Sequence, residues 1–210
     1  MTSPARAGLA DSASGHSEVQ IFFWHPRIIQ IGWAIGQVSD APYVTKQRFV
    51  KPWGATVTPK AETLHGTSNA TLEASGGRSD AVLRKFLRDV LPACQCGGRV
   101  ISHHLEFDTG IIMSELERCG LAHLQSEWAS AVRQGTCTMD PGICRWVHKC
   151  FGREATGTHI PLRDMVLALV ENGEQLLAKH HAAGADAQMH RLVYGALNTL
   201  AKKASNSICS

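Results

Sequence analysis

Two aspartates and one histidine have the residue types and surroundings that suit them for chemistry. Asp108 ends the run HHLEFD, where a short apolar segment gives way to a helix, so its carboxylate is expected at a strand end beside a helix N-terminus. Asp186 follows His181 by five residues, and the small residues between them permit close backbone approach. A histidine paired with an acid can transfer a proton beside a metal ion. This pattern predicts such a site.

Each of these residues also has an ordinary structural interpretation. Asp108 and Asp186 both stand where a helix is expected to begin, and acids stabilise helix N-termini without any catalytic role. His181 is equally compatible with a place on the surface. His190, one helical turn after Asp186 on the same face, is an alternative proton acceptor that no pattern distinguishes from His181. Residue types alone leave these alternatives open.

The elements that must position these residues are a strand pair followed by helices that alternate with short strands. Gly, Ser, Asp and Pro between the first two apolar segments predict an antiparallel pair. Strands are expected at 27–35, 43–52, 99–104 and 135–139, and helices at 59–64, 79–91, 107–119, 143–150, from 161 onward and at 183–204. Ser79 is expected to cap its helix. The order predicts an α/β fold, a mixed sheet flanked by helices.

Composition describes an ordinary globular chain. It has 210 residues, 44% of them hydrophobic and 19% charged, which is long enough for one domain with a full core. We expect a disordered lead-in at 1–17, one domain at 18–204 and a tail at 205–210. No apolar run approaches the roughly 18–20 residues that span a bilayer, so no membrane partner is expected. The net charge of +3 neither favours nor excludes nucleic-acid binding.

Cysteine usage favours reduced thiols. The chain has seven cysteines, an odd number, and its N-terminus lacks a secretory signal pattern, so an intracellular location, cytoplasmic or nuclear, is expected, with organellar targeting left open. Cys144, His148 and Cys150 suggest a zinc site as a second metal hypothesis. Their spacing matches no standard zinc pattern, and ordinary partly buried thiols are the alternative.

Six segments occur together in an order that is typical of one enzyme family. They are RIIQIGWAI (27–35), PKAETLHG (59–66), HHLEFD (103–108), CTMDP (137–141), PLRDM (161–165) and HAAGAD (181–186). The set resembles the DEDDh-type 3′–5′ exonucleases, the group that includes the proofreading subunit of bacterial DNA polymerase III and the ribonuclease T-like enzymes. The resemblance covers residues 27–201, most of the chain.

The resemblance implies an RNase H-like fold and removal of nucleotides from the 3′ end of single-stranded DNA or RNA. In this family four acidic residues hold two divalent ions, Mg²⁺ or Mn²⁺, which activate water and stabilise the leaving oxygen. By resemblance Asp108 and Asp186 are metal ligands and His181 is the general base. His65 and Gly66 match the segment that contacts the terminal nucleotide, and His104 stands where the family usually has Asn. Many members are homodimers, so a homodimer is a further expectation.

The first acidic motif of the family is missing. The family begins with a strand that ends in Asp-x-Glu, whereas the residues before Arg27 read GHSEVQIFFWHP. Asp11 and Glu18 are the only acids in the first 39 residues, and neither has the expected setting. The run VQIFFW (19–24) is a candidate for the missing first strand, which would otherwise be incomplete or altered.

Three interpretations of that loss remain. The sequence is a truncated or mis-predicted product, with Asp-x-Glu upstream; or it is a catalytically impaired relative that binds nucleic-acid ends or a protein; or Glu18 replaces the lost acids. Loss of one well-placed electrostatic group typically costs about 10²–10³ in rate. A single weakly held Mg²⁺, which keeps several waters, remains compatible with two carboxylates.

Overall fold

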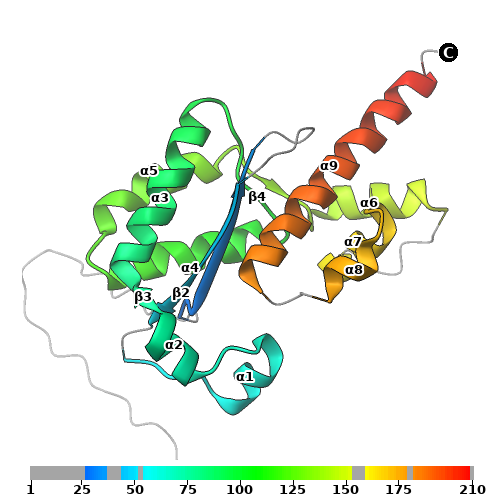
Figure 1. Ribbon diagram of the computed structural model, residues 1–210. Helices are drawn as coiled ribbons and strands as arrows, with labels where there is room; N and C mark the ends of the chain where they lie inside the picture. Colours follow the sequence, from blue (N-terminus) through cyan, green and yellow to red (C-terminus); the bar gives the residue numbers. More distant parts are fainter. Residues whose placement is uncertain (1–26, 37–43, 52–53, 153–158, 179–181, 209–210) are drawn as a thin grey trace, which may run out of the picture.

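The computed structural model describes residues 27–36, 44–51, 54–152, 159–178 and 182–208, and it is a mixed α/β structure rich in helix (Figure 1). The predicted lead-in at 1–17 lies outside the described residues. The described elements, in chain order, are β1 (Gln30–Ile35), β2 (Val44–Lys51), α1 (Pro59–His65), α2 (Asn69–Ser75), β3 (Gly77–Arg78), α3 (Ser79–Gln95), β4 (Ile101–Ser102), α4 (Leu105–Arg118), η1 (Ala122–Leu124), α5 (Gln125–Val132), β5 (Thr136–Cys137), α6 (Pro141–Cys150), α7 (Leu162–Leu169), α8 (Gly173–Leu177) and α9 (Ala183–Ile208).

The described strands form two separate sheets. β1 pairs with β2 in an antiparallel arrangement, with Gln30 opposite Phe49 and Ile35 opposite Val44. The end of β2 also pairs with β3, in a parallel arrangement. β4 and β5 form a second, parallel pair. The predicted antiparallel strand pair is therefore confirmed, and so is the mixed character of the sheet. The expectation of one continuous sheet is not met by the described strands, because β1 and β4 lie in different sheets.

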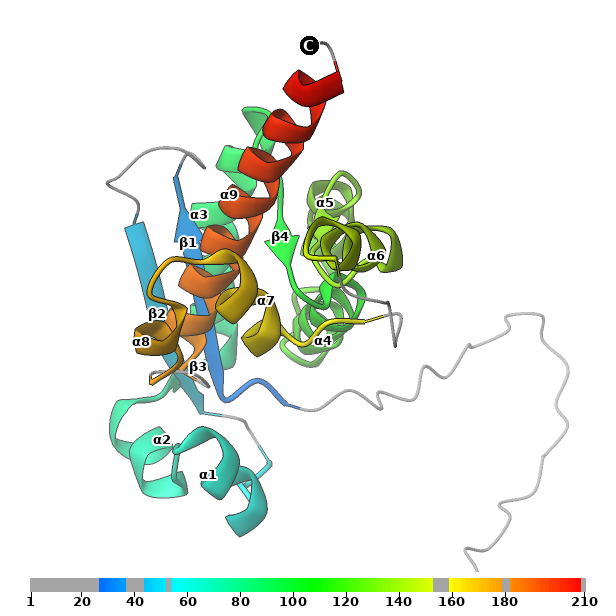
Figure 2. The same cartoon turned by 90° about the vertical axis from the view of Figure 1, so that its right-hand side faces the viewer.

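Helices cover both faces of the β1–β2 ribbon. α3 lies on one face and α9 on the other, whereas α1 and α2 lie beyond the end of the ribbon (Figures 1 and 2). The alternation of strand side chains explains this arrangement. Trp33 points to α3 and meets Phe86 edge-to-face, with ring centroids 5.5 Å apart. Gly32 points the other way, to the start of α9.

Two hydrophobic clusters hold the elements together. The first lies between the β1–β2 ribbon, α3, α4 and α5, and one of its two tryptophans, Trp128, is 2% exposed. The second joins α6, α7 and α9 around Met165, Met189 and Val193, which are fully buried. None of the described helices is both long enough and apolar enough to cross a membrane.

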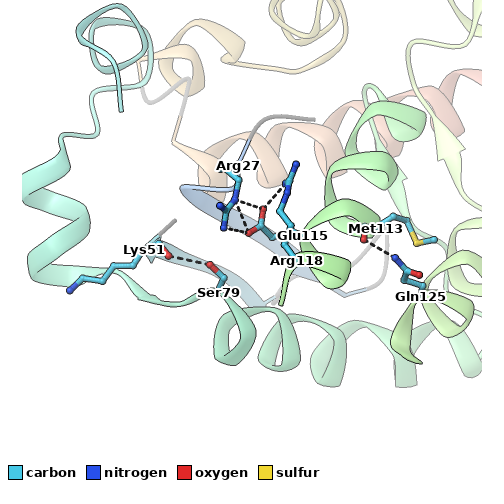
Figure 3. Close-up of polar contacts among 7 residues, drawn as sticks. All are labelled: Arg27, Lys51, Ser79, Met113, Glu115, Arg118 and Gln125. Atoms are coloured by element: carbon cyan, nitrogen blue, oxygen red, sulfur yellow. Dashed lines mark hydrogen bonds and ion pairs between the residues drawn. The ribbon is translucent and has the colours of Figure 1, made fainter. Parts of the chain in front are cut away.

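The predicted helices are present, with shifted ends. α1 ends as predicted at Gly66, whose φ of 67° is in the left-handed region that glycine adopts easily. The prediction that Ser79 caps α3 is wrong: Arg78 is the capping residue, and the Ser79 hydroxyl donates to the Lys51 carbonyl at 3.1 Å instead (Figure 3). That bond ties α3 to β2. α9 continues beyond the predicted end at 204, to Ile208, into the segment predicted to be a tail.

A buried carboxylate joins α4 to the residue that leads into β1. Glu115 is completely buried and lies between two arginines (Figure 3). The Arg27 guanidinium donates to it at 2.8–3.1 Å through two of its nitrogens, and Arg118 Nη1 donates at 3.1 Å. Fork-shaped guanidinium groups satisfy several lone pairs of one carboxylate, which offsets the cost of burying the charge.

Replacing Glu115 with Gln should lower the free energy of unfolding by about 3–5 kcal/mol, because two arginines would lose their shared counter-charge. Chemical denaturation followed by circular dichroism measures this change. Glu117→Gln is the matched control, since Glu117 is exposed on the same helix and should change stability little. Equal stability of the two variants would show that the ion pairs do not hold α4 to β1.

Candidate functional site

Asp108 lies in the first turn of α4, directly after β4. The Ser102 hydroxyl, from the last residue of β4, donates to Asp108 Oδ2, and the backbone N–H of His104 donates to Ser102 Oγ at 3.3 Å. This chain of contacts fixes the carboxylate at the strand end. Burial raises the pKa of Asp108, although the bond from Ser102 acts in the opposite direction. Asp108 is therefore a carboxylate held in surroundings that disfavour its own charge.

Asp186 lies in the first turn of α9, whose start is fixed by the β1–β2 ribbon. Gln30 Oε1 accepts from the backbone N–H of Ala183, and Gln47 Oε1 accepts from that of Gly184, both at 2.9 Å. These two side chains satisfy N–H groups that have no partner within a helix. Gly32 permits the contact, because a Cβ there would lie 2.0 Å from the Ala183 carbonyl oxygen. The strand sequence thus determines where Asp186 lies.

Asp108 and Asp186 line the same cavity. It has a volume of about 530 Å³ and lies between β1, β4, α3, α4 and α9. The α9 residues that line it recur at helical spacing along one face: Ala183, Asp186, Ala187, His190, Arg191 and Tyr194. The two aspartates are the only carboxylates among its described lining residues. Two acids that are far apart in the sequence are therefore brought to one opening.

One of the lining residues, His190, stacks on a second histidine, His103, which is not among the lining residues. The rings of His103 and His190 have centroids 6.3 Å apart and planes 26° apart, and His103 Nδ1 lies 3.0 Å from the Thr138 hydroxyl. Burial, together with a smaller effect of the nearby His103, lowers the pKa of His190 to about 4. Burial lowers the pKa of His103 as well. His190 is therefore neutral at pH 7, the state in which an imidazole can accept a proton.

The other predicted site residues are distributed differently. His181 lies outside the described residues. His65 and Gly66 lie at the end of α1 and do not line the cavity; His65 Nδ1 accepts from the Thr67 N–H at 3.1 Å. His104 is exposed beside Phe107 and is not among the lining residues either. Of the predicted set, only Asp108 and Asp186 are brought together by described residues.

The donor set fits one hydrated divalent ion better than two. Among the residues that are described, no three His, Cys, Asp or Glu side chains gather into a group that could hold a metal. This finding also bears against the zinc hypothesis: Cys144 is fully buried, Cys150 is exposed, and burial raises the pKa of the Cys144 thiol. Among the described residues that line the cavity, Asp108 and Asp186 are the two carboxylates, the hard oxygen ligands that Mg²⁺ or Mn²⁺ prefer.

Comparison of the chain with models of known protein families finds no match, and comparison with curated proteins also finds none. The assignment of function therefore depends on the geometry of the cavity and on the resemblance of the six sequence segments.

Several residues of the site were not predicted from the sequence. Ser102, which holds Asp108, reads only as part of a buried strand. Arg191 and Tyr194 share the cavity face of α9 with Asp186, and the spacing of Asp186, His190 and Tyr194 at i, i+4 and i+8 was the available signal. The two glutamines that fix α9 carry no local signal, because their partners are distant in the sequence.

Asp108→Asn should stabilise the metal-free protein at neutral pH. Because the folded-state pKa of Asp108 is raised, its contribution to stability is complete below about pH 3.8 and is lost as the pH rises through the folded pKa. We expect the variant to gain, relative to wild type, on the order of 1 kcal/mol in free energy of unfolding as the pH rises to 7. Urea unfolding in EDTA at several pH values measures this gain. Asp164→Asn, at an exposed carboxylate of α7, is the control, and parallel curves for Asp108→Asn and wild type would contradict the prediction.

His190→Phe should reduce the acid sensitivity of the fold. A folded pKa of about 4 against 6.5 in the unfolded chain means that His190 withdraws stability as the pH falls from 6.5 to 4, by up to about 3 kcal/mol at 1.36 kcal/mol per unit. The free energy of unfolding of wild type, relative to that of the variant, should therefore fall as the pH falls over this range. His123→Phe, at an exposed histidine, should leave the wild-type pH dependence unchanged. An unchanged difference for His190→Phe would mean that this ring titrates normally.

Proposed function

We propose that the chain is an RNase H-like, metal-dependent 3′–5′ exonuclease domain that acts on single-stranded DNA or RNA, with its site in the cavity lined by Asp108 and Asp186. The observation that supports this most directly is that two acids from distant segments, each in the first turn of a helix, line one opening. The resemblance of six ordered segments to the DEDDh exonucleases supports the same reaction.

In this proposal the candidate site residues have three roles: metal binding, proton acceptance and attraction of phosphate. Asp108 and Asp186 would hold one Mg²⁺ or Mn²⁺ ion, which supplies activation of water and stabilisation of the leaving oxygen when it is bound. His181, by resemblance, accepts the proton of the attacking water, and the neutral His190 in the cavity is the alternative acceptor. Arg191, also in the lining, offers a cation of the kind that phosphates attract.

A second candidate function is supported by the composition of the cavity lining. Two carboxylates are half the number that the resemblance implies, and the described residues contain no group of three metal-binding side chains. A domain with this lining can bind nucleic-acid ends without hydrolysing them. Oligonucleotide binding without metal-dependent turnover distinguishes this function from the first.

The decisive experiment is incubation of the purified protein with a 5′-labelled single-stranded oligonucleotide and Mg²⁺ or Mn²⁺. If the proposal is correct, the oligonucleotide shortens from its 3′ end, and Asp186→Asn lowers the rate at least about 10²-fold because an electrostatic ligand is lost. Asp164→Asn, an exposed acid in the first turn of α7 that does not line the cavity, is the matched control and should retain the wild-type rate.

The controls separate the two candidate functions. Oligonucleotide binding by a folded wild-type protein that never shortens the substrate would support the binding domain and contradict the nuclease. Shortening that Asp186→Asn and Asp108→Asn leave unchanged would place the activity elsewhere, or in a contaminant. If the folded protein neither binds nor shortens the oligonucleotide, both candidate functions are contradicted.

A further inference from the structure

α6 carries an exposed basic face. Arg145 and Lys149 are both exposed, and because they are four residues apart they lie on the same side of the helix. The segment 141–152, which contains α6, has no Asp or Glu. None of the ion pairs among the described residues includes Arg145 or Lys149. In the described part of the chain, these two positive charges therefore face solvent without a counter-charge.

Stabilisation of the helix itself explains only one of the two cations. The C-terminus of a helix carries a partial negative charge that favours cations in the last turn, where His148 and Lys149 lie. This effect falls off within that turn, and Arg145 lies one turn earlier. The helix itself therefore gives no reason for Arg145, whereas an anionic partner does.

Two aromatic side chains accompany the basic face. Phe151, the residue at which α6 ends, is 42% exposed, and none of the ring contacts among the described residues includes it. Trp146, next to Arg145 in the sequence, is half-buried and packs against the second hydrophobic cluster. One aromatic ring is thus available at the end of the helix, and a second is partly accessible beside the cations.

This combination of side chains fits a single-stranded nucleic acid. Phosphates bind to the cations of such a surface, and unpaired bases stack on its aromatic rings. A lipid surface instead binds helices that expose a broad apolar face. Of the large apolar side chains at 141–152, only Phe151 is exposed, so α6 lacks such a face.

α6 begins beside the segment that carries Asp108. β4 and β5 are parallel, so the helices that follow them, α4 and α6, begin at the same edge of this strand pair. His103, after β4, has its Nδ1 3.0 Å from the hydroxyl of Thr138, after β5. The buried side of α6 packs on α9 through the second hydrophobic cluster, and both helices lie on the same side of the β1–β2 ribbon (Figures 1 and 2). A nucleic-acid strand that leaves the cavity can therefore reach α6.

We propose that the α6 face, made of Arg145, Trp146, Lys149 and Phe151, binds a single-stranded nucleic acid at nucleotides that lie outside the cavity. The inference rests on the proposed function, because its partner is the strand whose 3′ end occupies the cavity. Cations that contact phosphates and rings that stack on bases hold a strand without reading its sequence. The α6 face would thus supply affinity, and the cavity would receive the 3′ end.

Fluorescence anisotropy of a labelled single-stranded oligonucleotide, titrated with the full-length protein in EDTA, tests the α6 face. EDTA removes divalent ions, so binding is measured without metal-dependent hydrolysis. Replacing both Arg145 and Lys149 with Ala should weaken binding roughly tenfold or more, because two phosphate contacts are lost. The slope of log affinity against log salt should become shallower by about 1.4, at about 0.7 per phosphate contact on a single strand.

The matched control replaces Arg84 and Arg88 with Ala. These two arginines are exposed and have the same spacing on α3, so the variant has the same change in net charge. α3 also contains Asp80 and Asp89, and it lies on the opposite side of the β1–β2 ribbon from α9 (Figure 1). This variant should keep the wild-type affinity and salt dependence.

Substitution of Phe151 tests the stacking contact separately from charge. Phe151→Ala should weaken binding about tenfold and leave the salt dependence unchanged, because a stacked base is lost but no phosphate contact is. Phe151→Trp keeps an aromatic ring and should retain the wild-type affinity. Circular dichroism checks that each variant is folded.

The outcomes separate this inference from the proposed function. Wild-type affinity in the folded Arg145 and Lys149 variant, or equal weakening in the α3 control, would overturn the inference and leave the nuclease assay to be judged by itself. Binding that depends on the α6 face, without shortening of the oligonucleotide in Mg²⁺ or Mn²⁺, would support the inference and contradict the nuclease. If the α6 substitutions abolish binding to phosphatidylserine–phosphatidylcholine vesicles and leave oligonucleotide binding unchanged, the face binds membranes and the inference is wrong.

Discussion

The close approach of α9 to β1 at Gly32 determines where the site residues lie. Any side chain at this position would meet the Ala183 carbonyl, so α9 can begin here only because the strand presents no Cβ. Gln30 and Gln47 then take two of the N–H groups at the helix start. With the first turn fixed, helical periodicity carries Asp186, His190 and Tyr194 along one face into the cavity.

The opposite wall of the cavity depends on a second constraint. Asp108 is held by Ser102 at the end of β4, and α4 is tied to the start of β1 through Glu115 and Arg27. The buried ion pair and the close glycine contact are thus the two points that bring α4 and α9 to opposite sides of one opening. Buried charge is a poor source of net stability but a specific one, since only one arrangement satisfies all of its partners.

The sequence predicted the local elements well and the long-range ones poorly. Apolar periodicity and turn residues located the antiparallel strand pair, the helix that ends at Gly66 and the long helix from Ala183, because these signals are local. The prediction that Ser79 caps α3 failed because the Ser79 hydroxyl donates to the backbone carbonyl of Lys51, a partner that a local sequence pattern cannot identify. The short helices α2, α5 and α8 were not predicted, because such short elements have few apolar positions to set a period. Sequence motifs named Asp108 and Asp186 as candidate site residues, but the burial that raises the pKa of Asp108 results from packing, which local sequence does not show.

The two hydrophobic clusters have a consequence for cooperativity. One cluster joins the β1–β2 ribbon to α3, α4 and α5, and the other joins α6, α7 and α9, with the cavity bordered by elements of both. Two such cores can open as separate folding units, and since α9 packs on the β1–β2 ribbon, opening between them must break the close contact at Gly32 and the hydrogen bonds to Gln30 and Gln47. Asp108 and Asp186 come from elements of different units, so a partial opening would separate them while leaving each core folded. The site would therefore report on the coupling of the two units more sensitively than either core does.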